Sequence, residues 1–182
     1  IMSSDWSSDV CSSDLPKTGN ADDVLQVDGL LKKAEIKKEL PPGSLGIFPL
    51  IETCEAVMKV MEIAQASARV QGLVFGHEDF LLNLNASHTQ DNSNLAVPRI
   101  RVAMAARAAG CHPIDTPYLD IKNVDGCHAH VRTSRNLGFS GMLVLHPIQI
   151  EAANQGYAPS EDEIAEAEAT VEQDRRAREE NR

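Results

Sequence analysis

The chain has 182 residues, with 17 basic and 27 acidic side chains and a formal net charge of −10. This length is sufficient for one domain with a sizeable core, and the negative charge argues against a nucleic-acid partner. The sequence has neither an apolar run of about 18 residues nor a signal-peptide core, so we expect a cytoplasmic protein without a membrane contact. The four cysteines form no CxxC pair, which is typical of reduced thiols rather than of a disulfide or zinc framework.

Residues 1–15, IMSSDWSSDVCSSDL, repeat Ser-Ser-Asp three times and have no apolar periodicity. The run DVCSSDL also resembles the in-frame translation of a common sequencing-adapter end. The alternative is a natural disordered N-terminus that is rich in serine and aspartate. We favour the adapter interpretation, and therefore expect a non-native or disordered leader over 1–15, one domain over 16–158 and a truncated C-terminal helix over 159–182.

The first expected helix begins at Asn20, which can cap it together with Asp23, and ends near residues 34–38. Its apolar positions are Val24, Val27, Leu30 and Leu31. Thr53 is the expected cap of the next helix, whose expected inward stripe is Val57, Val60, Met61 and Ala64.

Short continuous apolar runs are typical of strands that are buried on both faces, and they predict strands over residues 45–51, 72–75, 112–116 and 141–145. Polar residues 83–96 form a loop long enough to be a functional loop over a site. Three further helices are expected to stop at Gly110, Gly138 and Gly156. A capping box of Ser160 and Glu163 begins the last helix.

Four successive strand–helix units predict an α/β fold with a parallel sheet and right-handed crossovers. Four units make half of a (β/α)8 TIM barrel, which typically needs about 250 residues. A small open doubly wound sheet is the alternative. No Gly-rich loop of phosphate-binding form follows a predicted strand, which disfavours nucleotide binding.

Acidic side chains follow the first two of these strands. Glu52 comes after IFPLI, and Glu78 with Asp79 comes after LVFGH. Because the carboxyl ends of parallel strands meet at one edge of a sheet, where active sites form, these oxygens could bind a hard cation such as Mg²⁺. The spacing is equally consistent with acidic residues that only begin or cap helices.

The remaining candidates are weaker. Asp115 follows the third strand and could line the site, as we favour, or cap the next turn. His146 follows the fourth strand and could serve a substrate, or form a hydrogen bond at the rim. We expect Arg99 to be a surface charge or a rim salt bridge. Cys127, His128 and His130 are not expected to form a metal cluster, because residues two apart on a helix do not share a face.

The motifs PLIET, GLVFGHEDF, AMAARAAG, PID, RNLGFSGMLVLHPIQI and NQGYAPS are found in this order between about residues 15 and 172. In these motifs the chain resembles the HpcH/HpaI aldolase and citrate-lyase family, and more narrowly its citrate lyase β-subunit-like acyl-CoA lyases. The resemblance implies a TIM barrel that binds Mg²⁺ through Glu52 and Asp79. The backbone around Gly76 would line the same rim, and Glu78 would only begin a helix.

The resemblance also implies the chemistry, which is cleavage or formation of a carbon–carbon bond in a 3-hydroxyacyl-CoA such as malyl-, citramalyl- or citryl-CoA. The partners would be an acyl-CoA ester and a 2-oxoacid, and the parent protein would be a homo-oligomer, a trimer or a hexamer. We also consider a class II pyruvate-type aldolase that acts on free hydroxy-oxoacids, and a truncated polypeptide without catalysis.

The family's substrate-binding arginine and its acid/base aspartate have no counterpart in this chain. The catalytic residues are therefore unknown, and we expect an inactive fragment that contains strands five to eight of the barrel and a tail helix. Leu15 would end the fourth strand.

Overall fold

A computed structural model of the chain describes residues 12–89 and 92–180. Its strands are β1 (Ser12–Leu15), β2 (Gly46–Ile51), β3 (Gly72–Phe75), β4 (His112–Asp115) and β5 (Gly141–Met142). Its helices are α2 (Ala21–Lys38), α3 (Cys54–Met58), α4 (Val60–Gln65), α5 (His77–Leu84), η1 (Ser93–Leu95), α6 (Ala96–Ala109), α7 (Val124–Asn136), α8 (Ile148–Tyr157) and α9 (Glu161–Glu180).

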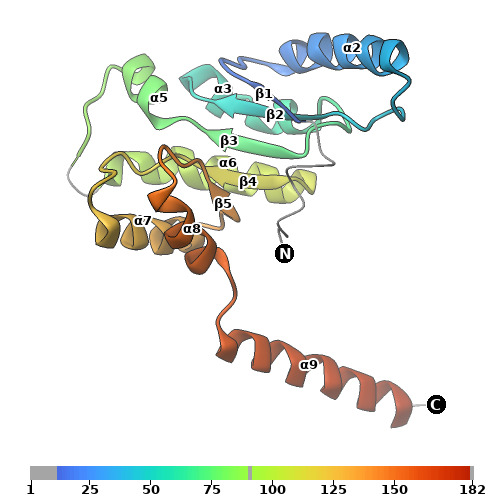
Figure 1. Cartoon of the computed structure of the whole chain (residues 1–182), viewed down its shortest axis with the longest axis vertical. Helices are drawn as coiled ribbons and strands as arrows, with labels where there is room; N and C mark the ends of the chain where they lie inside the picture. Colours follow the sequence, from blue (N-terminus) through green and yellow to red (C-terminus); the bar gives the residue numbers. More distant parts are fainter. Residues whose placement is uncertain (1–11, 90–91, 181–182) are drawn as a thin grey trace.

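The five strands form one parallel sheet in the order β1-β2-β3-β4-β5 (Figure 1). The predicted α/β fold with a parallel sheet is therefore confirmed. Helix α2 packs on α4, and α4 packs on α6, which also contacts β3 and β4. The described strand order has no reversal point, which a doubly wound sheet would need.

The sheet differs from the prediction at both ends. Ser12–Leu15, which we assigned to the leader, pairs in parallel with residues 46–49 of β2. Residues 1–11 lie outside the described part of the chain, and the non-native origin of the leader stays a prediction. At the other edge β5 ends at Met142 rather than at 145, because its partner β4 ends at Asp115.

The capping predictions at Asn20, Thr53 and Ser160 are confirmed. Gly110 and Gly138 adopt positive φ angles of 75° and 96° directly after α6 and close to the end of α7. The predicted stop at Gly156 is wrong, because α8 continues through Gly156 to Tyr157. A Cβ atom at this position would overlap Val131 of α7, so the glycine permits close helix packing.

The predicted inward position of Met61 is wrong, because Met61 is 37% exposed, and the apolar side chain of Leu30 on α2 is 63% exposed. The inward face of α2 instead carries Asp28 and Glu35, which bind the buried guanidinium of Arg69. This ion pair holds the pKa of Glu35 at about 2, well below its ordinary value. A charged network therefore replaces part of the apolar contact that the periodicity predicts.

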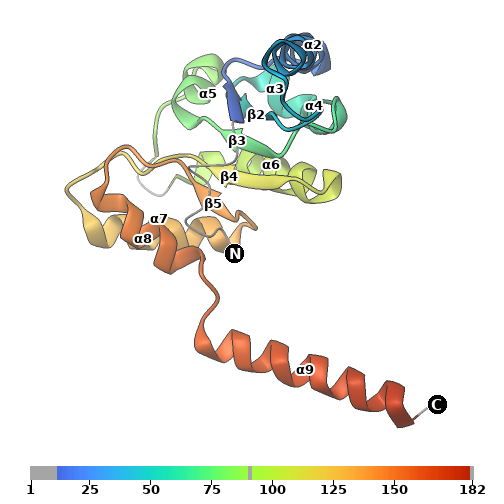
Figure 2. The same cartoon turned by 45° about the vertical axis from the view of Figure 1, so that its right-hand side comes forward.

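The main core lies between the sheet and helices α3, α4 and α6, and the largest fully buried side chains in it include Ile47, Ile63, Leu73, Phe75 and Val102. A smaller core joins α7 to α8. Helix α9 extends away from the rest of the molecule in both views (Figures 1 and 2). Within the described residues, no helix is both long enough and apolar enough to cross a bilayer.

Candidate metal site

The first two predicted carboxylates lie at adjacent strand ends. Glu52 directly follows β2, and Asp79 is in the first turn of α5, which follows β3. The ends of these strands are paired, with Ile51 opposite Phe75. The Glu52 side chain is buried, whereas Asp79 is exposed. The parallel sheet thus brings together the two residues that the sequence placed at one edge.

The backbone after β1 holds the Glu52 carboxylate in place. The N–H of Lys17 donates a hydrogen bond of 2.6 Å to Glu52 Oε1. Lys17 has a positive φ angle of 52°, a conformation that few non-glycine residues adopt. Three consecutive strand ends therefore contribute to this site.

Burial raises the pKa of Glu52, and the negative charge of Asp79 together with a hydrogen bond between the two side chains raises it further. The Lys17 N–H and the positive charge of the Lys17 side chain act in the opposite direction but do not cancel these effects. Two carboxyl groups this close together attract a positive charge, which is either a shared proton or a metal ion. A divalent cation fits this donor set, because Mg²⁺ is commonly bound by one or two carboxylates and several waters or substrate oxygens.

Gly76 provides the space that the Glu52 carboxylate occupies. A Cβ atom at Gly76 would lie 2.9 Å from Glu52 Oε2 and 2.9 Å from Glu52 Cβ. The Gly76 N–H donates to the carbonyl oxygen of Ile51 over 3.1 Å, which joins the two strand ends beside the carboxylate. Gly76 is thus adjacent to the predicted metal ligand, as its predicted place at the rim requires.

Asp115 and Arg99 form a buried ion pair. Arg99 Nε lies 3.1 Å from Asp115 Oδ1, and Arg99 Nη2 contacts Asp115 Oδ2. The N–H of Thr116 donates to Asp115 Oδ1 over 2.9 Å. The Asp115 carboxylate is fully buried among these partners, and a contact of Asp115 with substrate stays a prediction. Arg99 is only 4% exposed, so of its two predicted roles the structure supports the salt bridge and not the surface charge.

His146 is exposed, and its Nδ1 accepts the Ile148 N–H over 3.2 Å. This hydrogen bond lies at the start of α8 and agrees with the predicted alternative that His146 forms a local hydrogen bond. A contact of His146 with substrate stays a prediction.

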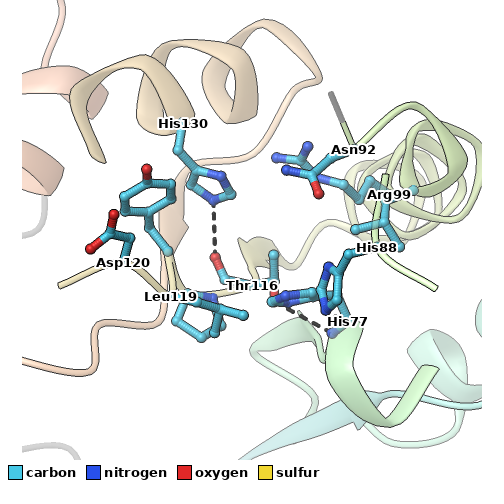
Figure 3. Close-up of a pocket in the computed structure, with 11 residues that line it drawn as sticks. His77, His88, Asn92, Arg99, Thr116, Leu119, Asp120 and His130 are labelled. Atoms are coloured by element: carbon cyan, nitrogen blue, oxygen red, sulfur yellow. Dashed lines mark hydrogen bonds between the residues drawn. The ribbon is translucent and has the colours of Figure 1, made fainter. Parts of the chain in front are cut away.

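A cavity of about 200 Å³ lies between the start of α5, the segment before α6, and the segment after β4. It is lined by His77, His88, Asn92, Leu95, Arg99, Thr116, Pro117, Tyr118, Leu119, Asp120 and His130. Figure 3 shows His77 and His88 together on one side and His130 on the other. The predicted polar loop therefore contributes to a cavity wall, although Glu52 and Asp79 do not line this cavity.

His130 donates from Nε2 to the carbonyl oxygen of Thr116 over 3.2 Å, and burial lowers its pKa (Figure 3). Cys127 instead packs in the small core between α7 and α8. Cys127 and His130 thus have different surroundings, the small core and the cavity. No sequence signal indicated that His77, His88 and His130 share a cavity, because they come from α5, a loop and α7.

Comparisons with known proteins give a consistent set of similarities. The profile of the family described as HpcH/HpaI aldolase/citrate lyase matches residues 10–147. The chain is 34% identical to the citrate lyase subunit beta of Escherichia coli, over 87% of this chain and 52% of that protein. It is 31% identical to the L-malyl-CoA/beta-methylmalyl-CoA lyase of Cereibacter sphaeroides, over 84% of this chain and 53% of that protein.

The fold is similar to the crystal structure of protein CitE from Mycobacterium tuberculosis in complex with magnesium and pyruvate. The TM-score is 0.67 at 27% identity, covering 82% of this chain and 58% of that chain. The chain spans about half the length of the curated relatives that it matches.

Proposed function

Because the chain belongs to the HpcH/HpaI aldolase/citrate lyase family, we propose that it is the metal-binding part of a Mg²⁺-dependent carbon–carbon lyase. The parent enzyme would cleave or form a 3-hydroxyacyl-CoA, with a 2-oxoacid and an acyl-CoA as the other reactants. Relatives named citrate lyase subunit beta and malyl-CoA lyase favour a CoA ester over a free hydroxy-oxoacid. Similarity to a structure that contains magnesium and pyruvate supports both the metal and the oxoacid.

The observation that carries this proposal is the pairing of Glu52 with Asp79 at adjacent strand ends, where the negative charge of Asp79 contributes to the raised pKa of Glu52. When bound there, Mg²⁺ would orient the oxoacid and stabilise negative charge on its reacting oxygen. Lys17 fixes the direction of the Glu52 carboxylate through its N–H, and Gly76 leaves that carboxylate room. Asp79 is exposed, so it provides the side of the pair that solvent and substrate reach.

We further propose that the sheet is the C-terminal part of a TIM barrel. Strand β1 would be the end of barrel strand four, and β2 to β5 would be strands five to eight. The sequential parallel strand order and a length about half that of the relatives support this assignment. The parent would then supply an earlier strand with a substrate-binding arginine and a later acid/base aspartate. Without them we expect the 182-residue chain to have no lyase activity.

The uninterrupted gene tests this proposal. Its product should cleave malyl-, citramalyl- or citryl-CoA in a Mg²⁺-dependent reaction, and Glu52→Gln should abolish that cleavage while Glu62→Gln, an exposed control on α4, should not. A parent protein that lacks both the early arginine and the late aspartate would contradict the lyase assignment. Cleavage by the 182-residue chain alone would contradict its expected inactivity.

A further inference from the structure

We propose that His77, Glu78 and His88 form a second metal site, which would hold a divalent transition-metal ion such as Zn²⁺ at the wall of the cavity. Within the described part of the chain, these three side chains are the group of histidine, cysteine and acidic residues whose ligand atoms all lie within 4.8 Å of one another. The site is distinct from the Glu52–Asp79 pair, because it uses imidazole nitrogens, and because its two histidines line the cavity.

Both imidazoles direct the same ring nitrogen at one carboxylate oxygen. Glu78 Oε1 lies 2.8 Å from His77 Nε2 and 2.7 Å from His88 Nε2. The two rings are nearly perpendicular, with an interplanar angle of 79° and centroids 5.3 Å apart. Three ligand atoms therefore converge on one point, although His88 is on the loop after α5 and the other two residues are on α5 itself.

The ring of His77 is held by a contact of its other nitrogen. Nδ1 contacts Thr116 Oγ1, and the same hydroxyl oxygen accepts the backbone N–H of His77 over 3.4 Å (Figure 3). His77 is 5% exposed and Thr116 is 2% exposed, so both are fixed by packing. A hydrogen bond to the second ring nitrogen is the usual way in which proteins orient a metal-binding histidine.

Two imidazoles and one carboxylate are a donor set that suits Zn²⁺ and similar ions, whereas Mg²⁺ prefers oxygen ligands alone. Bonds of about 2.0–2.2 Å would require the ligand atoms to separate by roughly half an ångström. The side chains of Glu78 and His88 are 59% and 44% exposed, so they can move while His77 stays in place. Three protein ligands leave a position for water or for an anionic group in the cavity.

The alternative is that Glu78 only accepts hydrogen bonds from the two imidazoles and thereby ties the loop to α5. Titration of the 182-residue chain with Zn²⁺ alone, followed by isothermal calorimetry, separates the two interpretations. We expect one site that is weakened in His88→Ala and Glu78→Gln by at least the roughly 10–100-fold that loss of an outer-sphere partner costs. His112→Ala, an exposed histidine at the opposite end of β4, should bind Zn²⁺ like the wild type.

Equal Zn²⁺ affinity in the wild type, His88→Ala and Glu78→Gln would overturn the proposal. Loss of Zn²⁺ binding on thiol alkylation, with binding retained in His88→Ala, would assign the ion to cysteine and would also overturn it. The ring signals of His77 and His88 in histidine NMR spectra should shift on addition of Zn²⁺. Asp79→Asn should keep Zn²⁺ binding even as it loses Mg²⁺ binding, so the failure of one site does not decide the other.

Discussion

The α-carbon of Gly76 lies against the Glu52 carboxylate, so that a Cβ atom there would be 2.9 Å from Glu52 Oε2. The φ and ψ angles of Gly76, −106° and 99°, are available to alanine, so the effect of a substitution comes from contact rather than from backbone strain. We expect Gly76→Ala to push the carboxylate aside and to weaken Mg²⁺ binding by roughly tenfold or more, since even outer-sphere partners have effects of this size.

Mg²⁺ calorimetry on Gly76→Ala, with Gly29→Ala as control, checks this prediction. Gly29 has no atom within 4 Å of an added Cβ and lies inside α2, so alanine there should leave the metal affinity unchanged. Equal Mg²⁺ affinity in Gly76→Ala and the wild type would show that Glu52 does not need the space.

The buried ion pair of Arg99 and Asp115 should contribute strongly to the stability of the fold. We expect Arg99→Met to lower the free energy of unfolding by about 3–5 kcal/mol, because it leaves the Asp115 carboxylate buried without its counter-ion. Urea unfolding followed by circular dichroism measures the change. Arg101→Met, an exposed neighbour on α6, is the matched control and should cost much less. If Arg99→Met lowers the free energy of unfolding by less than about 1 kcal/mol, the pair contributes no more than an exposed salt bridge does.

The close contact between α8 and α7 predicts a rescue experiment. Gly156→Ala places a Cβ atom on Val131 and should cost about 1–3 kcal/mol by overpacking. The double variant Gly156→Ala/Val131→Ala should recover part of this loss, because the smaller side chain makes room. If the losses of unfolding free energy in the two single variants simply add in the double variant, the contact between Gly156 and Val131 does not limit the packing, and the prediction is contradicted.

The ion pair of Glu35 with Arg69 predicts a pH dependence of stability. The pKa of Glu35 falls from an ordinary value of 4.5 to about 2 in the folded chain, chiefly through its hydrogen bonds with Arg69. Because the folded-state pKa lies below the unfolded value, this stabilisation is present above pH 4.5 and is lost as the pH falls towards about 2.

Between these pH values, the free energy of unfolding should therefore change less with pH in Glu35→Gln than in the wild type. Glu163, whose pKa is also lowered to about 2 by Arg135, provides the comparison. Its ion pair is exposed, so its contribution should disappear at high salt whereas that of Glu35 should persist. A pH dependence of Glu35→Gln identical to the wild type would contradict the role of this pair.

The residues show which features local sequence patterns could predict. Short apolar runs and capping residues located β2, β3, β4 and most helices, and strand ends located Glu52 and Asp79, because these signals are local. Asp28 and Glu35 were not expected inside, since their burial depends on Arg69, which is 41 and 34 residues away. A salt bridge of Arg99 was one of two predictions, but its burial and its partner could not be predicted, because Asp115 lies on a different element.

The candidate metal sites likewise combine features that local sequence patterns predict with features that they do not. The Glu52–Asp79 pair follows from the parallel register, whereas the Lys17 hydrogen bond that holds Glu52 comes from the unusual backbone of a loop. His77 and His88 approach each other only because the chain after α5 folds back. No helical or strand periodicity encodes such a return.

Mg²⁺ calorimetry on the 182-residue chain tests the central claim most directly. We expect one site that is lost in Glu52→Gln and in Asp79→Asn, and that is retained in Glu62→Gln and in His88→Ala. The first two variants remove the paired carboxylate charge that makes the site attractive to a divalent cation, and the second two do not touch it. Wild-type Mg²⁺ affinity in both Glu52→Gln and Asp79→Asn would contradict the assignment of the metal site.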